Sequence, residues 1–212
     1  PVFTEGLDYS CAVFDGRGEL VAQHAFDLVH LACMGFAVEW ALEEIGLENL
    51  EQGDIIFHND PYRGGNHISD TTIMAPVFFE GEIVAVPATR AHQTDMGGMV
   101  PGNFAGDATE IFQEGLRIPP VKIFRAGEEQ TDIWKLILAN VRDPRSLWGD
   151  MQAMFGSLKV AESRVLQYIK KYGVKTWKDC IEEMKDLGER RIRSEILAIP
   201  DGRYEAEDYL DD

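Results

Sequence analysis

Cysteine is scarce in this sequence, and its few cysteines show no pairing pattern. Cys11, Cys33 and Cys180 are scattered, odd in number and without a C-x-x-C spacing. Disulfide frameworks and zinc knuckles both require closely patterned cysteines. We therefore predict three buried thiols that form neither kind of cross-link.

Long apolar runs and basic residues are scarce as well. No segment approaches the roughly 20 apolar residues of a membrane-spanning helix, and no basic-then-apolar leader opens the chain. The 20 lysines and arginines are outnumbered by 37 aspartates and glutamates, which gives a formal net charge of -17. That charge repels phosphate backbones and anionic lipid. The sequence thus predicts a cytoplasmic protein that binds neither nucleic acid nor membranes.

Three common motifs are missing: the phosphate-binding G-x-x-x-x-G-K-S/T, the dinucleotide-binding G-x-G-x-x-G and the nucleophile elbow G-x-S-x-G. Any nucleotide chemistry is therefore expected of another chain. What remains is an ordinary globular composition, with 45% hydrophobic residues among 212. Such a chain can bury a full core in one or two domains.

The first half of the chain predicts strands around one helix. Residues 28–46 place apolar side chains three and four apart and end at a glycine, as a capped helix does. Segments rich in β-branched and aromatic residues predict strands at 8–15, 19–25, 54–60, 71–80 and 82–92. Gly16-Arg17-Gly18 and Glu80-Gly81-Glu82 are typical hairpin turns. The order strand-strand-helix-strand-strand-strand predicts an α+β fold, an antiparallel sheet with a packed helix.

The second half is predicted to be helical. Helical periodicity covers residues 131–141, 146–173 and 176–199, with Pro144 and Gly173 as breaks, and a short terminal strand is expected at 202–210. A glycine-rich loop of about residues 93–120 precedes these helices, and a loop of that length usually belongs to a site or a lid. We expect two domains: a mixed domain at 1–130 that carries this loop, and a helical region at 131–212 that continues beyond this sequence.

The polar segment NDPYRGGNHISDTT, residues 59–72, raises the question of a metal site. His67 and Asp70 lie three apart in a turn, and His92 ends the last predicted strand. Because that strand pairs back through the turn at 80–82, about ten residues on each side bring His92 beside Asp70. Two imidazoles and one carboxylate with open coordination positions form a catalytic metal site. The mixed domain is therefore predicted to hold zinc, manganese or iron on His67, Asp70 and His92.

Other polar residues near these ligands are expected to support the chemistry. Residues predicted to orient the imidazoles or act as further ligands are His58, Asn59, Asp60 and Asp95. We predict Asp60, Asp95 and Glu110 as catalytic groups, Glu110 as a general base. His30, Arg90, Gly97 and Gly98 are predicted to bind substrate, the glycines because they let the backbone approach a ligand. The alternatives are structural: a core histidine, a salt bridge and ordinary turns.

A family resemblance rests on these same segments. NDPYRGGNHISDTT, RAHQTDMGG, TEIFQEGLRIPPVKIF and LILANVRDPRSLWGD together resemble the B-type subunit of the hydantoinase/oxoprolinase family. That family includes N-methylhydantoinase B, half of 5-oxoprolinase and the metal-bearing subunit of acetone and acetophenone carboxylases. Because the family's B-type subunits are longer, the resemblance implies an N-terminal portion. In the carboxylases the metal is bound by a His, an Asp three residues on and a further His, which implies His67, Asp70 and His92.

The resemblance implies a divided reaction in a hetero-oligomer. An A-type partner with an actin-like ATPase fold would bind ATP and phosphorylate the small-molecule substrate, and the B-type subunit would complete hydrolysis of a cyclic amide such as hydantoin or 5-oxoproline at its metal. The alternative within the family is ATP-dependent carboxylation of a ketone. A non-haem iron oxygenase shares the two-His-one-carboxylate set, but usually has H-x-D spacing in an all-β barrel. A non-catalytic ligand-binding module is a further alternative.

Overall fold

The computed structural model describes residues 5–24 and 27–209. Its strands are β1 (Tyr9–Phe14), β2 (Leu20–His24), β3 (Ile55–His58), β4 (Asp70–Met74), β5 (Val77–Phe79), β6 (Glu82–His92), β7 (Val121–Arg125) and β8 (Glu128–Glu129). Its helices are α2 (Leu28–Ile45), α3 (Thr131–Ala139), α4 (Pro144–Tyr172) and α5 (Val174–Ala198), with 3-10 turns η1 (Leu47–Asn49), η2 (Pro61–Arg63) and η3 (Ile111–Gln113). None of the helices within the described ranges combines the length and the apolar composition that crossing a bilayer would take.

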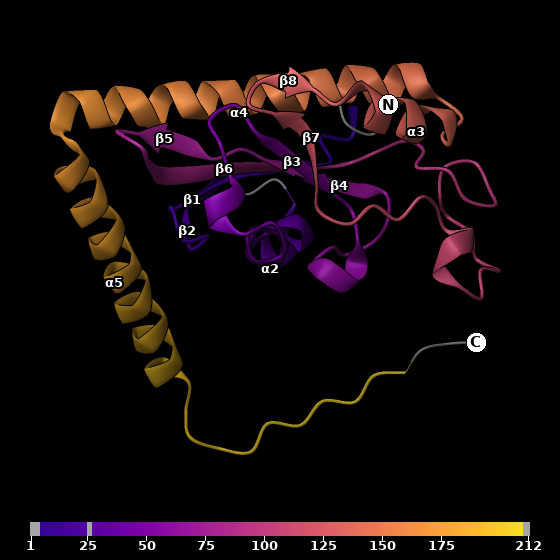
Figure 1. Ribbon diagram of the computed structural model, residues 1–212. Coiled ribbons are helices and arrows are strands. Elements are labelled where there is room, and N and C mark those ends of the chain that lie inside the picture. The colour runs from indigo at the N-terminus through magenta and orange to yellow at the C-terminus, as the bar shows by residue number, and fades with distance from the viewer. Residues whose placement is uncertain (1–4, 25–26, 210–212) are drawn as a thin grey trace.

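An antiparallel sheet forms the middle layer of the molecule. Its strands follow the order β2-β1-β6-β4-β3-β7-β8, and β5 pairs separately with β6. Helix α2 covers one face, while α3 and α4 cover the other (Figure 1). Because both faces are covered, every residue of β6 from Val84 to His92 is buried. The α+β fold with a helical C-terminal half is confirmed.

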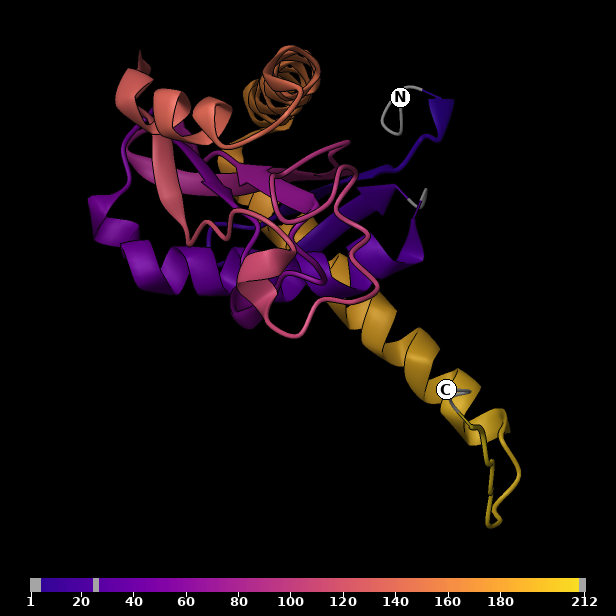
Figure 2. The ribbon, with the colours of Figure 1, turned by 90° about the vertical axis from the view of Figure 1, so that its right-hand side faces the viewer.

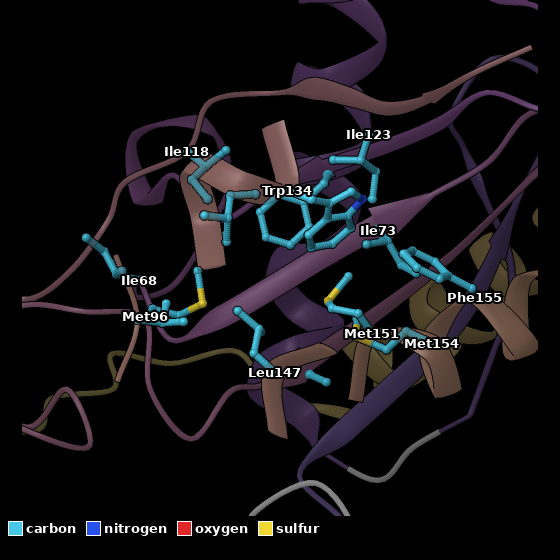
Figure 3. Packing of buried hydrophobic residues seen from close by; sticks show 14 of the residues in the cluster. Ile68, Ile73, Met96, Ile118, Ile123, Trp134, Leu147, Met151, Met154 and Phe155 are labelled. Carbon is cyan, nitrogen blue, oxygen red and sulfur yellow. The ribbon is translucent and has the colours of Figure 1, made fainter. Parts of the chain in front are cut away.

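Two of the three apolar clusters among the described residues join the two faces of the sheet to α2 and to α3 and α4, and neighbouring residues of β3 and β4 enter different clusters. Toward α2, Met34 and Val38 pack with residues that include Ile56 and Met74. Toward α3 and α4, buried side chains of the sheet and the helices meet around Trp134 (Figure 3): Phe57, Ile73, Ile123, Met151, Met154 and Phe155. The sheet therefore positions polar residues on the α2 face without interrupting the larger core on the other.

Helix α5 leaves the layered body. Near its start, Trp177 Nε1 donates to Val84 O at 3.0 Å, and Lys185 Nζ lies 2.7 Å from the Asp15 carboxylate. Beyond these contacts the helix projects away from the sheet (Figure 2). Residues 199–209 follow it as exposed, irregular chain.

Several expected elements differ from the structure. The strand expected at 71–80 is interrupted at Ala75-Pro76, because proline has no backbone N–H to continue a ladder. Strands β7 and β8 were not predicted. The strand expected at 202–210 is wrong for residues 202–209, because these residues form no strand and pair with no other strand. Ala25, expected in the second strand, and Leu210, in the last, lie outside the described residues.

Two further expectations concern the cysteines and the domain boundary. The three cysteines are free, as predicted, but none is fully buried: Cys11 and Cys33 are half-buried and Cys180 is exposed, so the predicted burial is wrong. Cys180 lies on the part of α5 that contacts the body, next to buried Ile181, but its own side chain faces solvent. The division into domains at residue 130 stays a prediction.

Candidate metal centre

Two neighbouring strands bring the predicted ligands together. Asp70 is the first residue of β4 and pairs directly with His92, the last residue of β6. The hairpin register predicted from the sequence is confirmed. Both side chains point to the face that α2 covers, since their strand neighbours Met74 and Ala88 lie in the cluster on that side.

Three donor atoms converge at this point. Nε2 of His67 lies 2.7 Å and Nδ1 of His92 lies 2.9 Å from Oδ1 of Asp70, and the two nitrogens are 3.2 Å apart. Protonating both nitrogens would direct two N–H groups at one oxygen and crowd their hydrogens together. A divalent ion removes this conflict, because its ligand atoms at about 2.1 Å from the ion lie roughly 3 Å from one another. The donor set and its spacing therefore fit a metal.

The turn that carries His67 is fixed from two sides. The Asn59 side chain donates to Ile68 O at 2.8 Å and to Leu116 O at 3.0 Å, and accepts from Ile118 N at 2.7 Å. Gly64 packs its backbone directly on α2, where a Cβ would come within 2.4 Å of Ala37 N. Gly64 thus lets this loop lie against the helix, and Gly65 lets it fold closely on Asp60, where a Cβ would come within 2.8 Å of the Asp60 carbonyl oxygen.

The second oxygen of Asp70 also has partners. Nε2 of His30, a buried residue of α2, lies 3.0 Å from Oδ2 of Asp70, and Asn66 Nδ2 donates to the same oxygen. Asp8 approaches from the chain just before β1, with Oδ1 3.4 Å from His30 Nε2 and Oδ2 3.9 Å from His92 Nδ1. Asp70 is therefore held by both oxygens, with a second carboxylate beside it.

The electrostatics favour a cation at this position. Burial acts to raise the pKa of Asp70, yet hydrogen bonds with His30, His67 and His92 outweigh it and hold that pKa well below its usual range. The pKa of His67 is raised, chiefly by its bond to Asp70. Burial raises the pKa of Asp8. A permanently charged carboxylate that attracts positive charge from the surrounding imidazoles is the property that a metal site uses.

The predicted catalytic groups have other partners. Asp60 is buried; it accepts from Tyr62 N and pairs with Arg63 at 2.5 Å. Asp95 accepts from Arg142 and from Gly97 N, and Glu110 caps the exposed turn η3. These contacts place all three in the surrounding loops, and their catalytic role stays a prediction.

Of the predicted substrate-binding residues, one contacts the donor cluster and the others have different partners. His30 reaches the donor cluster through its contact with Asp70. Arg90 has no exposed surface and donates to Thr72 Oγ1 at 2.7 Å and to Gly64 O at 3.1 Å. The Gly97 and Gly98 carbonyls accept hydrogen bonds from Arg142. Contact of Arg90 and the two glycines with a substrate stays a prediction.

Sequence reasoning missed Asp8, Arg142 and Phe104. Asp8 lies beside the donor cluster because β1 pairs with β6, and His92 N donates to Asp8 O at 3.1 Å. Only this long-range pairing locates it, and no local motif marks it. Phe104 stacks on His92 with ring centroids 5.8 Å apart, and the irregular loop that carries it has no periodic signal.

The entire chain matches one protein family. The model for Hydantoinase B/oxoprolinase covers residues 1–212. The chain belongs to this family, as the sequence segments around the donor cluster indicated.

Curated relatives and a solved structure agree with that membership. The beta subunit of the Pseudomonas jessenii caprolactamase is 37% identical over 211 residues, covering 100% of this chain and 36% of the relative. The B-type subunit of a putative D-/L-hydantoinase from Pseudomonas sp. (strain NS671) is 31% identical, covering 99% of this chain and 36% of the relative. The crystal structure of the ATP-dependent caprolactamase from Pseudomonas jessenii superimposes with a TM-score of 0.89 at 38% identity, covering 92% of this chain and 34% of that chain. This chain thus spans about a third of the length of these relatives.

Proposed function

We propose that this chain is the metal-bearing part of a B-type subunit of an ATP-dependent hydrolase of cyclic amides. The observation that supports it best is the convergence of His67 Nε2, Asp70 Oδ1 and His92 Nδ1 within 3.2 Å of one another. The names of the relatives, one a caprolactamase and the other a hydantoinase, support the substrate class. The metal is zinc, manganese or iron, since imidazole and carboxylate suit all three.

Different residues of this chain bind the proposed metal and position its ligands. His67, Asp70 and His92 are the proposed ligands, while His30 and Asn66 fix the second oxygen of Asp70. A divalent ion held there supplies Lewis acidity, which polarises an amide carbonyl and lowers the pKa of water. We assign Asp8 as a further carboxylate facing the ion, because its Oδ2 lies 3.9 Å from His92 Nδ1.

ATP is proposed to bind a partner. This sequence carries no phosphate-binding loop of the G-x-x-x-x-G-K-S/T type. One relative is named as a beta subunit and its structure as an ATP-dependent caprolactamase, which supports a complex of more than one kind of chain. The proposed partner is an A-type subunit with an actin-like ATPase fold, which phosphorylates the amide oxygen before water opens the ring in this chain.

Metal content and substrate-dependent ATP consumption test this proposal. The complete protein, co-expressed with the A-type subunit, is expected to contain about one zinc, manganese or iron per chain by elemental analysis. His67→Ala and His92→Ala should each lose the metal and reduce turnover at least roughly 100-fold, as removal of a metal ligand does. His24→Ala, on exposed β2, is the matched control and should keep both.

Substrate choice separates hydrolysis from carboxylation. We expect ATP consumption with ε-caprolactam, hydantoin or 5-oxoproline and release of a ring-opened product. Consumption of ATP with acetone and bicarbonate alone would instead identify a ketone carboxylase. The proposed site would be contradicted if the wild-type protein contained no metal, or if His67→Ala kept full turnover.

A further inference from the structure

Phe104 lies against the donor cluster although most of its surface faces solvent. Its ring stacks on His92 with centroids 5.8 Å apart and planes 17° apart, and its centroid lies 6.5 Å from that of His67. The side chain is 78% exposed. A large apolar ring therefore stands beside two proposed metal ligands with one side free for another molecule.

The loop that carries Phe104 is anchored through the residues that precede this ring. Asn103 Oδ1 accepts from Met96 N at 2.8 Å, and its Nδ2 donates to Glu114 O at 2.9 Å. Arg142 holds the start of the loop, donating to Gly98 O at 2.6 Å and pairing with Asp95 at 3.1 Å. The residue before Phe104 is thus fixed by side-chain bonds, which sets the direction of the ring.

The donor cluster is open on the side of His67. The side chain of His67 is 36% exposed, whereas those of Asp70 and His92 are 1% and 8% exposed. A ligand that reaches the cluster from solvent therefore passes His67 and meets the Phe104 ring, which contacts both imidazoles. The apolar ring is part of the wall of this approach.

Charge around this approach is negative. Asp8 and Asp27 lie beside His30, and Glu114 acts electrostatically on His67. Arg63, Arg117 and Arg142 are surface cations of the surrounding loops, and each faces a carboxylate of those loops, Asp60 or Asp95. Within residues 5–24 and 27–209, no lysine or arginine forms an ion pair with Asp8, Asp27 or Asp70. An anionic substituent that lies along this approach, away from the ion itself, would face these carboxylates.

We infer that Phe104 is a specificity-determining residue of the proposed site, and that it selects an uncharged cyclic amide with an aliphatic ring. The ring carbons of such a substrate lie on the Phe104 face while its amide points to the donor cluster. A cyclic amide that bears a carboxylate, such as 5-oxoproline, fits this wall poorly. The inference rests on the proposed function, because it takes the donor cluster to hold the metal.

Paramagnetic relaxation tests the contact without ATP or a partner. The complete protein is loaded with Mn²⁺, and relaxation of the ring CH₂ protons of ε-caprolactam and of 5-oxoproline is measured against the Zn²⁺-loaded form. We expect ε-caprolactam to bind more tightly than 5-oxoproline. Phe104→Ala should raise its apparent Kd roughly tenfold, equivalent to about 1.4 kcal/mol, with unchanged metal content. Phe112→Ala removes another exposed ring from the same loop, one that contacts Arg117, and is the matched control.

Each outcome decides the inference. An unchanged Kd in Phe104→Ala, an equal loss in Phe112→Ala, tighter binding of 5-oxoproline, or no relaxation effect despite bound Mn²⁺ would overturn it and leave the metal site intact. A wild-type protein that binds no Mn²⁺, zinc or iron would overturn the proposed function as well.

Discussion

The protonation state of His58, a buried residue beside the candidate metal centre, gives a testable prediction. It pairs with Thr72 on β4, which pairs with Arg90 on β6, one row along the same face from Asp70 and His92. The side chain is fully buried. Burial, together with the charge of Arg90, lowers the pKa of His58 to about 3. The folded protein therefore keeps this imidazole neutral.

The lowered pKa makes the folded state lose stability in acid. Below its usual pKa of 6.5, His58 takes up a proton in the unfolded chain, while in the folded protein it does so only near pH 3. The unfolded state then binds more protons, so the free energy of unfolding falls as the pH falls through this window. From about pH 7 to about pH 5 the loss attributable to His58 is about 2 kcal/mol, since one pKa unit is worth about 1.4 kcal/mol.

Urea unfolding of the wild type and His58→Leu at about pH 7 and about pH 5 measures this loss. Leucine has a similar volume and no titrating group, so the variant should lose about 2 kcal/mol less than the wild type between the two conditions. His24→Leu changes an exposed histidine and should follow the wild type. Equal losses in the wild type and His58→Leu would refute the account of a neutral, buried His58.

Two further predictions concern the loops around the site. Gly98→Ala should lower the free energy of unfolding by roughly 1–3 kcal/mol, because its φ is +85° and a Cβ would meet Glu114 O at 2.6 Å; Gly102→Ala, with φ +80° and open space, should cost less in the same thermal or urea unfolding assay. Asn59→Ala should cost roughly 3 kcal/mol, about 1 kcal/mol for each of its three buried hydrogen bonds, and weaken metal binding measured by competition with a chelator. Asn140→Ala, which removes one exposed hydrogen bond to Leu136 O, is the control for Asn59→Ala. Equal losses of stability in Gly98→Ala and Gly102→Ala, or in Asn59→Ala and Asn140→Ala, would contradict these predictions.

The fold was predictable where local patterns decide it. Helix α2 has helical spacing and a terminal glycine, and β6 was predicted over the same residues, 82–92, that the structure gives. β7 and β8 were missed because they follow a long loop and pair with β3 and with each other. The strand expected at 202–210 failed because a β-prone composition forms a strand only where a partner strand lies beside it.

The donor cluster was predictable for a related reason. A tight turn at 80–82 sets the register of a hairpin, so sequence distance alone places His92 opposite Asp70. Asp8 comes from the other neighbour of β6, and no short turn connects the two strands. Phe104 belongs to a loop whose path depends on Asn103 and Arg142, and such contacts leave no periodic pattern in the sequence.

The direct pairing of Asp70 with His92 keeps the proposed metal site apart from the turn that connects its two strands. That turn, Glu80-Gly81, lies at the opposite end of β6, with β5 and the Ala75-Pro76 interruption between it and the two proposed ligands. Insertions near that turn can lengthen the hairpin without altering the ligand geometry. A single residue added between Ile73 and Met74, or between Ala88 and Thr89, would instead turn one ligand to the opposite face. Tolerance to insertion should therefore be uneven along this one hairpin, high at its tip and lost within the paired segment.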